Sequence, residues 1–225
     1  MFRTGLTFIL LFSLALPIQA LSRKKTINDA SYRSAYTVAL TSYKNQQFAL
    51  SVRQLIPLAK KNYAPAMAQL AYMYEYGIGL PKNITEANKL YKKLLINYLS
   101  KAQAGDVDAQ YQIGQLHYGG KGVPENVPEA IRWYLMAADQ GHLVSQYKLA
   151  LLYDSGEKAP HDPIAAIHWY TMAAEQGHTI SQLFLAIKYY RGRDVAQNYA
   201  QAANWFIKAA ENGNAYAQST LGFMY

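Results

Sequence analysis

Residues 105–141 read GDVDAQYQIGQLHYGGKGVPENVPEAIRWYLMAADQG, and residues 141–177 repeat the pattern as GHLVSQYKLALLYDSGEKAPHDPIAAIHWYTMAAEQG. Three kinds of residue recur with a period of 36, namely Gly105, Gly141, Gly177 and Gly213; Gln110, Gln146, Gln182 and Gln218; and Trp133, Trp169 and Trp205. Three independent markers that share one period indicate an internal structural repeat. An earlier copy contains Gly77-Ile78-Gly79-Leu80-Pro81, which matches residues 120–124 at a spacing of 43.

Each copy contains the signals of two helices. The first helix is expected near residues 108–118, 144–154 and 180–190 of the three regular copies. The second begins after a residue type that caps helix N-termini well, in the equivalent positions Asn83, Asn126, Asp162 and Asn198. Glu86 and Glu129, three residues further on, predict a capping box in two copies. One such pair cannot bury its Trp, Tyr and Leu side chains alone, so the sequence predicts an all-α stack of antiparallel helix pairs.

The repeat divides the chain into the following expected segments. A degenerate helix pair at 30–63, in which Pro57 should kink or shorten the second helix, is followed by repeats at 64–107, 108–143, 144–179 and 180–215. The first repeat has seven extra residues within 95–101, close to two helical turns. Residues 216–225 form the first helix of a fifth copy, from which we expect a truncated repeat.

The N-terminus has the layout of a secretory signal peptide at residues 1–20. Arg3 supplies a positive charge, residues 6–16 are mostly apolar, and the small residue Ala20 precedes the expected cleavage point. A basic segment follows at 21–29, and residues 21–63 carry eight Lys and Arg against one acid, Asp29. The chain has no cysteine, which excludes disulfides, thiolate metal sites and a cysteine nucleophile. From the signal-peptide layout of residues 1–20 we expect an exported protein, periplasmic or secreted.

Together these residues resemble the Sel-one-like repeat family, a branch of the tetratricopeptide-type helical repeats. The resemblance is carried by Ala109-Gln110, Ile113-Gly114, residues 120–124, Glu129-Ala130, Trp133-Tyr134, Ala137-Ala138 and Gly141. The third and fourth repeats depart from the family pattern, with Lys158 and Asp194 at the second glycine of the loop. The resemblance implies a right-handed superhelix (solenoid) and an adaptor that binds other proteins, in envelope processes or host interaction.

The resemblance also implies where a partner would lie, because the first helix of each pair lines the concave face of tetratricopeptide superhelices. Transferred by register, this face holds Tyr72, Tyr76, Tyr111, Gln115, Tyr118, Tyr147, Leu151, Asp154, Ile187, Tyr190 and Arg191. A groove of this kind would bind an extended peptide or a helix, and tyrosine is a residue type that such surfaces favour. The competing interpretation is that some of these side chains pack between helices.

No catalytic motif accompanies the repeats. His142 and His178 occupy equivalent turns, too far apart for one metal ion, and His117 stands where other copies have tyrosine, which favours a packed position. We expect no enzyme activity, no cofactor, no metal and no nucleic-acid partner. Two alternatives to an exported adaptor stay open: a scaffold at a membrane surface that uses the basic N-terminal segment, and a binder or enzyme of cell-wall polymers.

Overall fold

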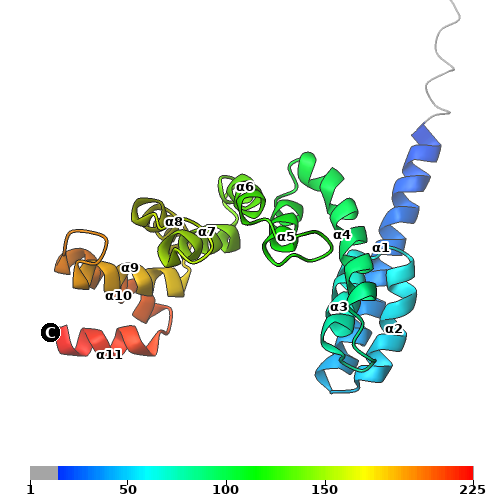
Figure 1. Cartoon of the computed structure of the whole chain (residues 1–225), viewed down its shortest axis with the longest axis horizontal. Helices are drawn as coiled ribbons and strands as arrows, with labels where there is room; N and C mark the ends of the chain where they lie inside the picture. The colour runs from blue at the N-terminus through cyan, green and yellow to red at the C-terminus, as the bar shows by residue number, and fades with distance from the viewer. Residues whose placement is uncertain (1–14, 225) are drawn as a thin grey trace, which may run out of the picture. The chain divides into compact units, whose positions relative to one another are not determined.

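The described part of the chain consists of helices joined by turns and loops. The computed structural model describes the backbone of residues 15–224 and the side chains of residues 29–223. It contains the helices α1 (Ala15–Lys44), α2 (Phe48–Lys60), α3 (Ala64–Tyr76), α4 (Ile84–Gln103), α5 (Val107–Tyr118), α6 (Val127–Ala138), α7 (Leu143–Ser155), α8 (Pro163–Glu175), α9 (Thr179–Arg191), α10 (Tyr199–Glu211) and α11 (Ala215–Met224) (Figure 1). No strand occurs between residues 15 and 224, so the all-α prediction is confirmed. The predicted signal peptide lies mainly outside the described residues, as do the side chains of residues 21–28.

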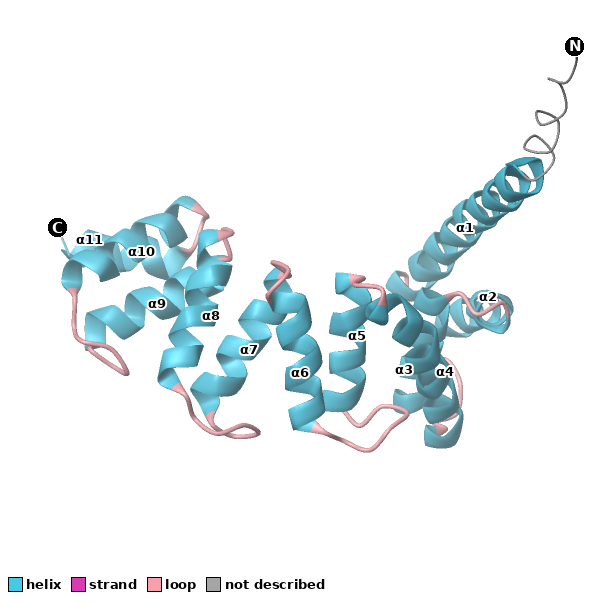
Figure 2. Cartoon of the chain, turned by 90° about the horizontal axis from the view of Figure 1, so that it is seen from above, coloured by secondary structure: helices cyan, strands magenta, loops and turns pink. Residues whose placement is uncertain are grey.

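The chain forms two compact units, one ending at Leu94 and the other beginning at Leu95. In the second unit the pairs α5/α6, α7/α8 and α9/α10 stack in chain order, and α11 packs on α10 (Figure 2). In the first unit α2 packs against both α1 and α3. Pro57 lies inside α2 without ending it, because the helix continues to Lys60.

Each second helix begins as the sequence predicts. The side chains of Asn83, Asn126, Asp162 and Asn198 accept a hydrogen bond from the backbone N–H three residues on, at 2.9–3.0 Å. The capping-box prediction is wrong for the two glutamates, because Glu86 binds Lys89 and Glu129 binds Arg132 and Trp133. The N–H of the cap residue is already used: that of Asn126 donates to the carbonyl of His117 on the preceding helix. The same bond recurs at the other three caps and ties each second helix to the first.

The core of the second unit repeats with the period of the sequence. Tyr134, Tyr170 and Phe206 occupy one position in three successive pairs, and each is almost completely buried. Small residues beside them allow close packing, since a Cβ added to Gly114 would lie 2.5 Å from the ring of Tyr134. Alanines on the facing helices, including Ala150 and Ala186, are fully buried in the same cluster. Burial of this repeated aromatic layer favours the stacked arrangement.

The periodic glutamines form a ladder between pairs. Gln146 is fully buried, its amide donates to the carbonyl of Ala138 at 3.1 Å, and its oxygen accepts from Gln176 at 2.7 Å. Gln110 and Gln182 make the same two bonds at their own positions. The ladder satisfies buried carbonyl groups at the turn between helix pairs and joins residues 30 apart in the chain. It explains why the glutamine recurs in the sequence.

Candidate functional site

Four of the predicted partner-binding residues line one cavity in the second unit. Leu151 and Asp154 come from α7, Ile187 and Arg191 from α9, and the cavity has a volume of ≈480 Å³. These two helices are the first helices of successive pairs. The remaining wall is formed by Ser155, Glu157, Tyr170, Phe184, Lys188 and Arg193.

A buried lysine occupies one side of this cavity. The side chain of Lys188 is only 7% exposed, and its Nζ lies 2.6 Å from Oδ1 of Asp154 and 2.7 Å from Oδ2 of Asp194. Tyr170 donates its hydroxyl to the other oxygen of Asp154, at 3.1 Å. The lysine thereby joins α7, α9 and the loop after α9. A buried ammonium group requires such charged partners, because burial of an unpaired charge is very unfavourable.

The cluster shifts the titration of its members in the directions expected from these contacts. The hydrogen bond from Lys188 lowers the pKa of Asp194 below its ordinary value. Burial, reinforced by Asp154, raises the pKa of Tyr170, so this hydroxyl keeps its proton. Two guanidinium groups remain at the rim: Arg191 is exposed, and Arg193 is 73% exposed with its Nε 3.9 Å from Asp194. The cavity therefore combines an apolar wall with hydrogen-bond donors that a ligand can reach.

The loop after α9 holds Asp194 in place through an unusual backbone conformation. Asp194 has φ 65°, in the left-handed region that favours glycine, and Gly79 and Gly122 have φ 73° at the equivalent positions. Lys158, the other residue that departs from the family pattern, is not among the described residues with positive φ. Asp194 thus keeps the loop conformation of the glycine copies, and its bonds to Lys188 compensate for the strain.

Sequence reasoning did not find Lys188, although a signal was present. The equivalent positions in the other repeats are Met73, Leu116 and Leu152, all buried and apolar. A single lysine in an apolar column, together with the aspartate six residues later, would have indicated a buried ion pair. Its second acid, Asp154, could not be identified in this way, because that contact depends on how successive pairs stack.

The hydrogen-bonded pair of Tyr170 and Asp154 has a counterpart in the first repeat. Tyr91 donates to Glu75 at 2.7 Å, and these two residues are equivalent to Tyr170 and Asp154. In the second repeat the acid is replaced by Tyr118, and the buried hydroxyl of Tyr134 has no hydrogen-bond partner. Burial raises the pKa of Tyr134. The fourth repeat has Phe206 at this position and needs no partner.

The other predicted residues do not join the cavity. On α5 the amide of Gln115 donates to the hydroxyl of Tyr111, and Nζ of Lys158 lies 4.6 Å from the ring centroid of Tyr118. Tyr147 on α7 packs against the core cluster, as Tyr111 does. Leu151 and Ile187 pack against the same cluster, so this contact does not distinguish packing from partner binding, and the role of both tyrosines stays a prediction.

Three further predicted tyrosines are more exposed. Tyr190 packs its ring against Tyr199 on α10, 5.5 Å away between centroids. Tyr72 and Tyr76 lie on α3 of the first unit with ring centroids 4.7 Å apart, and they are 40% and 57% exposed. They therefore form a separate aromatic pair, and their role in partner binding stays a prediction.

The two equivalent histidines cap helices. Nδ1 of His142 accepts from the N–H of Ser145 at 3.2 Å, and Nδ1 of His178 accepts from the N–H of Ser181 at 3.3 Å. Their rings lie 4.9 Å from Tyr111 and 4.4 Å from Tyr147 between centroids. Burial lowers the pKa of both histidines, although Asp108 opposes this at His142. In the part of the chain that the structure describes, no group of three or more His, Cys, Asp or Glu side chains could hold a metal ion.

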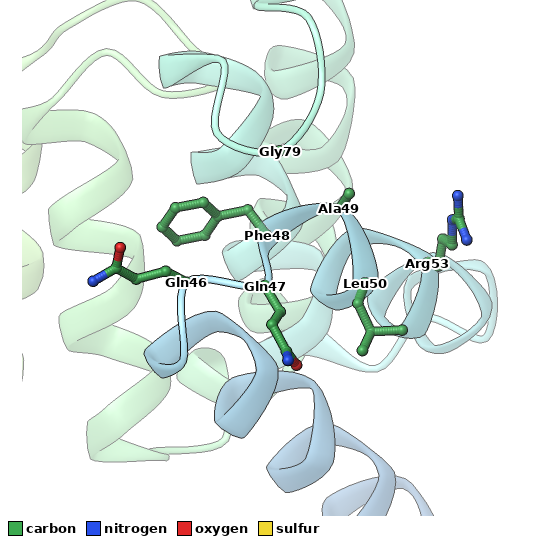
Figure 3. Close-up of a pocket in the computed structure, with 7 residues that line it drawn as sticks. All are labelled: Gln46, Gln47, Phe48, Ala49, Leu50, Arg53 and Gly79. Carbon is green, nitrogen blue, oxygen red and sulfur yellow. The ribbon is translucent and has the colours of Figure 1, made fainter.

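The first unit contains a cavity of ≈550 Å³ beside the start of α2 (Figure 3). It is lined by Gln46, Gln47, Phe48, Ala49, Leu50, Arg53 and Gly79. None of the predicted partner-binding residues lies here. The close contact in this region is between Gly79 and the backbone of Phe48, which would lie 2.6 Å from a Cβ at residue 79.

Comparison with known proteins identifies the repeats. The family model for the Sel1 repeat matches residues 64–94, 107–142, 143–178 and 179–214. The solved structure of c5321, a protective antigen present in uropathogenic Escherichia coli strains, is 32% identical, with a TM-score of 0.58. The match covers 77% of this chain but only 36% of that one.

A second solved structure is similar over more of its length. A Sel1 repeat protein from Oxalobacter formigenes is 29% identical with a TM-score of 0.63, over 86% of this chain and 78% of that one. Among the helices that the structure describes, none is both long and apolar enough to cross a membrane.

Proposed function

Because the chain belongs to the Sel1 repeat family, we propose that it is an exported scaffold that binds a segment of a partner protein in the cavity between α7 and α9. Sel1 repeat proteins generally mediate protein–protein interactions and are typically not enzymes. The finer proposal concerns the place of binding, the chemistry of contact and the compartment. It needs support from this chain's own residues, because a fold is compatible with many functions.

The observation that carries the proposal is the convergence of Leu151, Asp154, Ile187 and Arg191 on one cavity. Two of them are aliphatic and half-buried, so they offer apolar contact to a partner side chain. Aliphatic surface in a shaped cavity beside a few polar groups is typical of binding sites.

The polar groups define how a partner segment would be held. Asp154 and Asp194 are already bonded to Lys188, which compensates one of their two negative charges. The exposed guanidinium groups of Arg191 and Arg193 can donate to carboxylates or to backbone carbonyls of the partner. The buried cluster keeps α7 and α9 at a fixed separation, so the cavity is formed before the partner arrives. Such preorganisation lowers the entropic cost of binding.

Export is the second part of the proposal and is supported by the sequence of residues 1–20. Arg3, the apolar residues 6–16 and Ala20 have the order found in secretory signal peptides. The test is the mass of the protein recovered from cells that synthesise the whole chain. A mature protein that starts at Leu21 supports export, whereas a chain that retains residues 1–20 contradicts it.

Partner binding is tested by site-specific photo-crosslinking. A photoreactive amino acid replaces Arg191 at the cavity or, as a control, Ile164 on α8, which is 82% exposed. We expect one protein to crosslink at position 191 and not at position 164. The same proteins at both positions would contradict a specific site.

A pair of charge reversals examines the same site without a crosslinker. Arg191→Glu with Arg193→Glu should reduce capture of that protein at least tenfold, because both donors are lost and the charge is inverted. Arg53→Glu with Lys60→Glu makes the same change in net charge on α2, and both residues are exposed. Equal loss of capture in the two double variants would show that net charge, and not the cavity, determines binding.

A further inference from the structure

A separate cavity of ≈530 Å³ lies in the second unit between the end of α4 and the pair α5/α6. Leu95 and Leu99 of α4, together with Trp133 and Met136 of α6, contribute apolar surface to it. His117 on α5 and Glu129 on α6 also line the wall. None of the predicted partner-binding residues lies in this cavity.

Two departures from the regular repeat create it. First, α4 has 20 residues where α6 has 12, and the additional turns carry Leu95 and Leu99. Second, His117 stands where the other repeats have Tyr74, Tyr153 and Tyr189. An imidazole ring is smaller than a phenol ring, so the substitution leaves unfilled space beside Trp133.

The polar groups of the wall differ in whether they have partners. Glu129 accepts bonds from Arg132 at 2.8 Å and from Trp133 at 2.7 Å, and the Arg132 bond lowers its pKa. Among the titratable side chains of the described wall, His117 alone has no hydrogen bond, and its Nδ1 is buried. The imidazole as a whole is only partly buried, so its Nε2 can form a hydrogen bond with a ligand in the cavity.

We propose that this cavity binds a hydroxylated aromatic ring. The ring would lie against the apolar wall formed by Leu99, Met136 and Trp133. A phenolic hydroxyl both donates and accepts, so it complements His117 in either neutral tautomer. Met136 adds a thioether that packs well against ring edges. The ring can belong to a small phenol or to a tyrosine side chain of another protein.

The probe is p-cresol, titrated into the purified full-length chain. Its binding is followed by the indole N–H signals of the three tryptophans in ¹⁵N-labelled protein, with Trp133→Phe used for assignment. We expect saturable binding with a Kd on the order of 1 mM, since the ligand is small. The signal of Trp133 should shift, while those of Trp169 and Trp205 stay in place. Absence of saturable shifts at Trp133 would overturn the proposal.

Three comparisons make the test specific. His117→Tyr should remove the imidazole and place a larger ring at the cavity wall, and so weaken p-cresol binding at least tenfold, while the far-ultraviolet circular dichroism stays that of a folded chain. Leu99→Glu should weaken binding to the same extent without changing a buried group, whereas Ile96→Glu on the same helix, 67% exposed and outside the cavity wall, should not. Toluene should bind roughly fivefold more weakly than p-cresol because it lacks the hydroxyl. Equal binding of p-cresol to the wild type and to His117→Tyr, or of toluene and p-cresol to the wild type, would overturn the assignment.

The source of the ring is decided with a blocked Ala-Tyr-Ala tripeptide. Displacement of p-cresol by this peptide, but not by Ala-Phe-Ala, assigns the site to a tyrosine of a protein partner. Binding of p-cresol without displacement by the peptide assigns it to a free phenol.

Discussion

Replacement of Lys188 by leucine tests whether the buried ion cluster holds the third and fourth repeats together. Leucine is the residue at the equivalent positions 116 and 152, where it is buried, so this helix position accepts a leucine in two other repeats. The change leaves Asp154 and Asp194 without their shared partner, although their side chains are only 21% and 18% exposed. Removal of one partner from a buried pair costs about 3–5 kcal/mol, and the partial exposure of the acids places the expected loss near the lower limit, about 3 kcal/mol.

The assay is urea unfolding followed by far-ultraviolet circular dichroism. A loss of about 3 kcal/mol should lower the urea midpoint by roughly 1–2 M for a typical dependence on denaturant. Lys148→Met on α7 is the control, because the described structure shows no ion pair for Lys148, and its midpoint should hardly change.

A triple variant separates the lost charge pairing from the lost lysine. Asp154→Tyr and Asp194→Gly, added to Lys188→Leu, replace each member of the cluster by the residue at its equivalent position in the second repeat, namely Tyr118, Gly122 and Leu116. The glycine also accepts the positive φ of residue 194 without strain. We expect the triple variant to recover to within about 1 kcal/mol of the wild type, because buried ion pairs can be replaced by packed apolar groups at little cost.

Unfolding at acidic pH gives an independent test of the ion pair between Lys188 and Asp194. Lys188 lowers the pKa of Asp194, so this contribution to stability is present above the ordinary aspartate pKa of about 3.9 and is lost as the pH falls through the lower folded value. The difference in the free energy of unfolding between the wild type and Lys188→Leu should therefore become smaller at acidic pH. The reasoning is refuted if Lys188→Leu unfolds at the wild-type midpoint at neutral pH, or if the triple variant is as unstable as the single one.

The remaining predictions use pairs of equivalent positions and the same unfolding assay. Tyr134→Phe removes an unpartnered buried hydroxyl and should leave the stability unchanged or raise it by up to about 1 kcal/mol. Tyr170→Phe removes a bond to Asp154 and should lower the stability by about 1.5 kcal/mol. Equal changes in stability for the two variants would contradict the proposed role of the Asp154 bond. Gly79→Ala should cost more than Gly105→Ala, since both have positive φ but only Gly79 has a backbone 2.6 Å from the added Cβ. The Gly105 change alone should cost about 1 kcal/mol, and a larger loss there would refute the steric argument. His178 caps α9 through its neutral ring and has a lowered pKa, so its contribution is present above about pH 6.5 and is lost as the pH falls through the folded value. His178→Asn replaces the cap by a side chain that does not titrate, and it should weaken the dependence of stability on pH between pH 7 and 5. An unchanged pH dependence would show that other groups cause it.

Much of the fold could be predicted because its signals are local and repeated. The caps at Asn126 and Asp162 bond to backbone groups three residues away, so the sequence window that contains the cap also contains its partner. The capping-box prediction for Glu129 was wrong because the N–H it should have accepted was already bonded to the preceding helix. That competing bond is visible only once both helices are packed.

The candidate site was predictable only in part. The register of the repeat placed Leu151, Asp154, Ile187 and Arg191 on first helices, and the structure brings these four together. The same register also selected Tyr111 and Tyr147, which lie outside this cavity and whose rings contact the helix-capping histidines His142 and His178. A tyrosine serves a core and a surface equally well, so the residue type does not distinguish them.

By itself the sequence determined the period, the pairs of helices, their N-terminal caps and the all-α class, because these depend on contacts within a few residues. The tertiary structure decided which side chains meet across repeats. Lys188 reaches Asp154 across 34 residues, and Lys158 reaches Glu125 across 33. The physical reason is that a bond between stacked pairs depends on their spacing and rotation, which follow from the packing of the whole aromatic and alanine core.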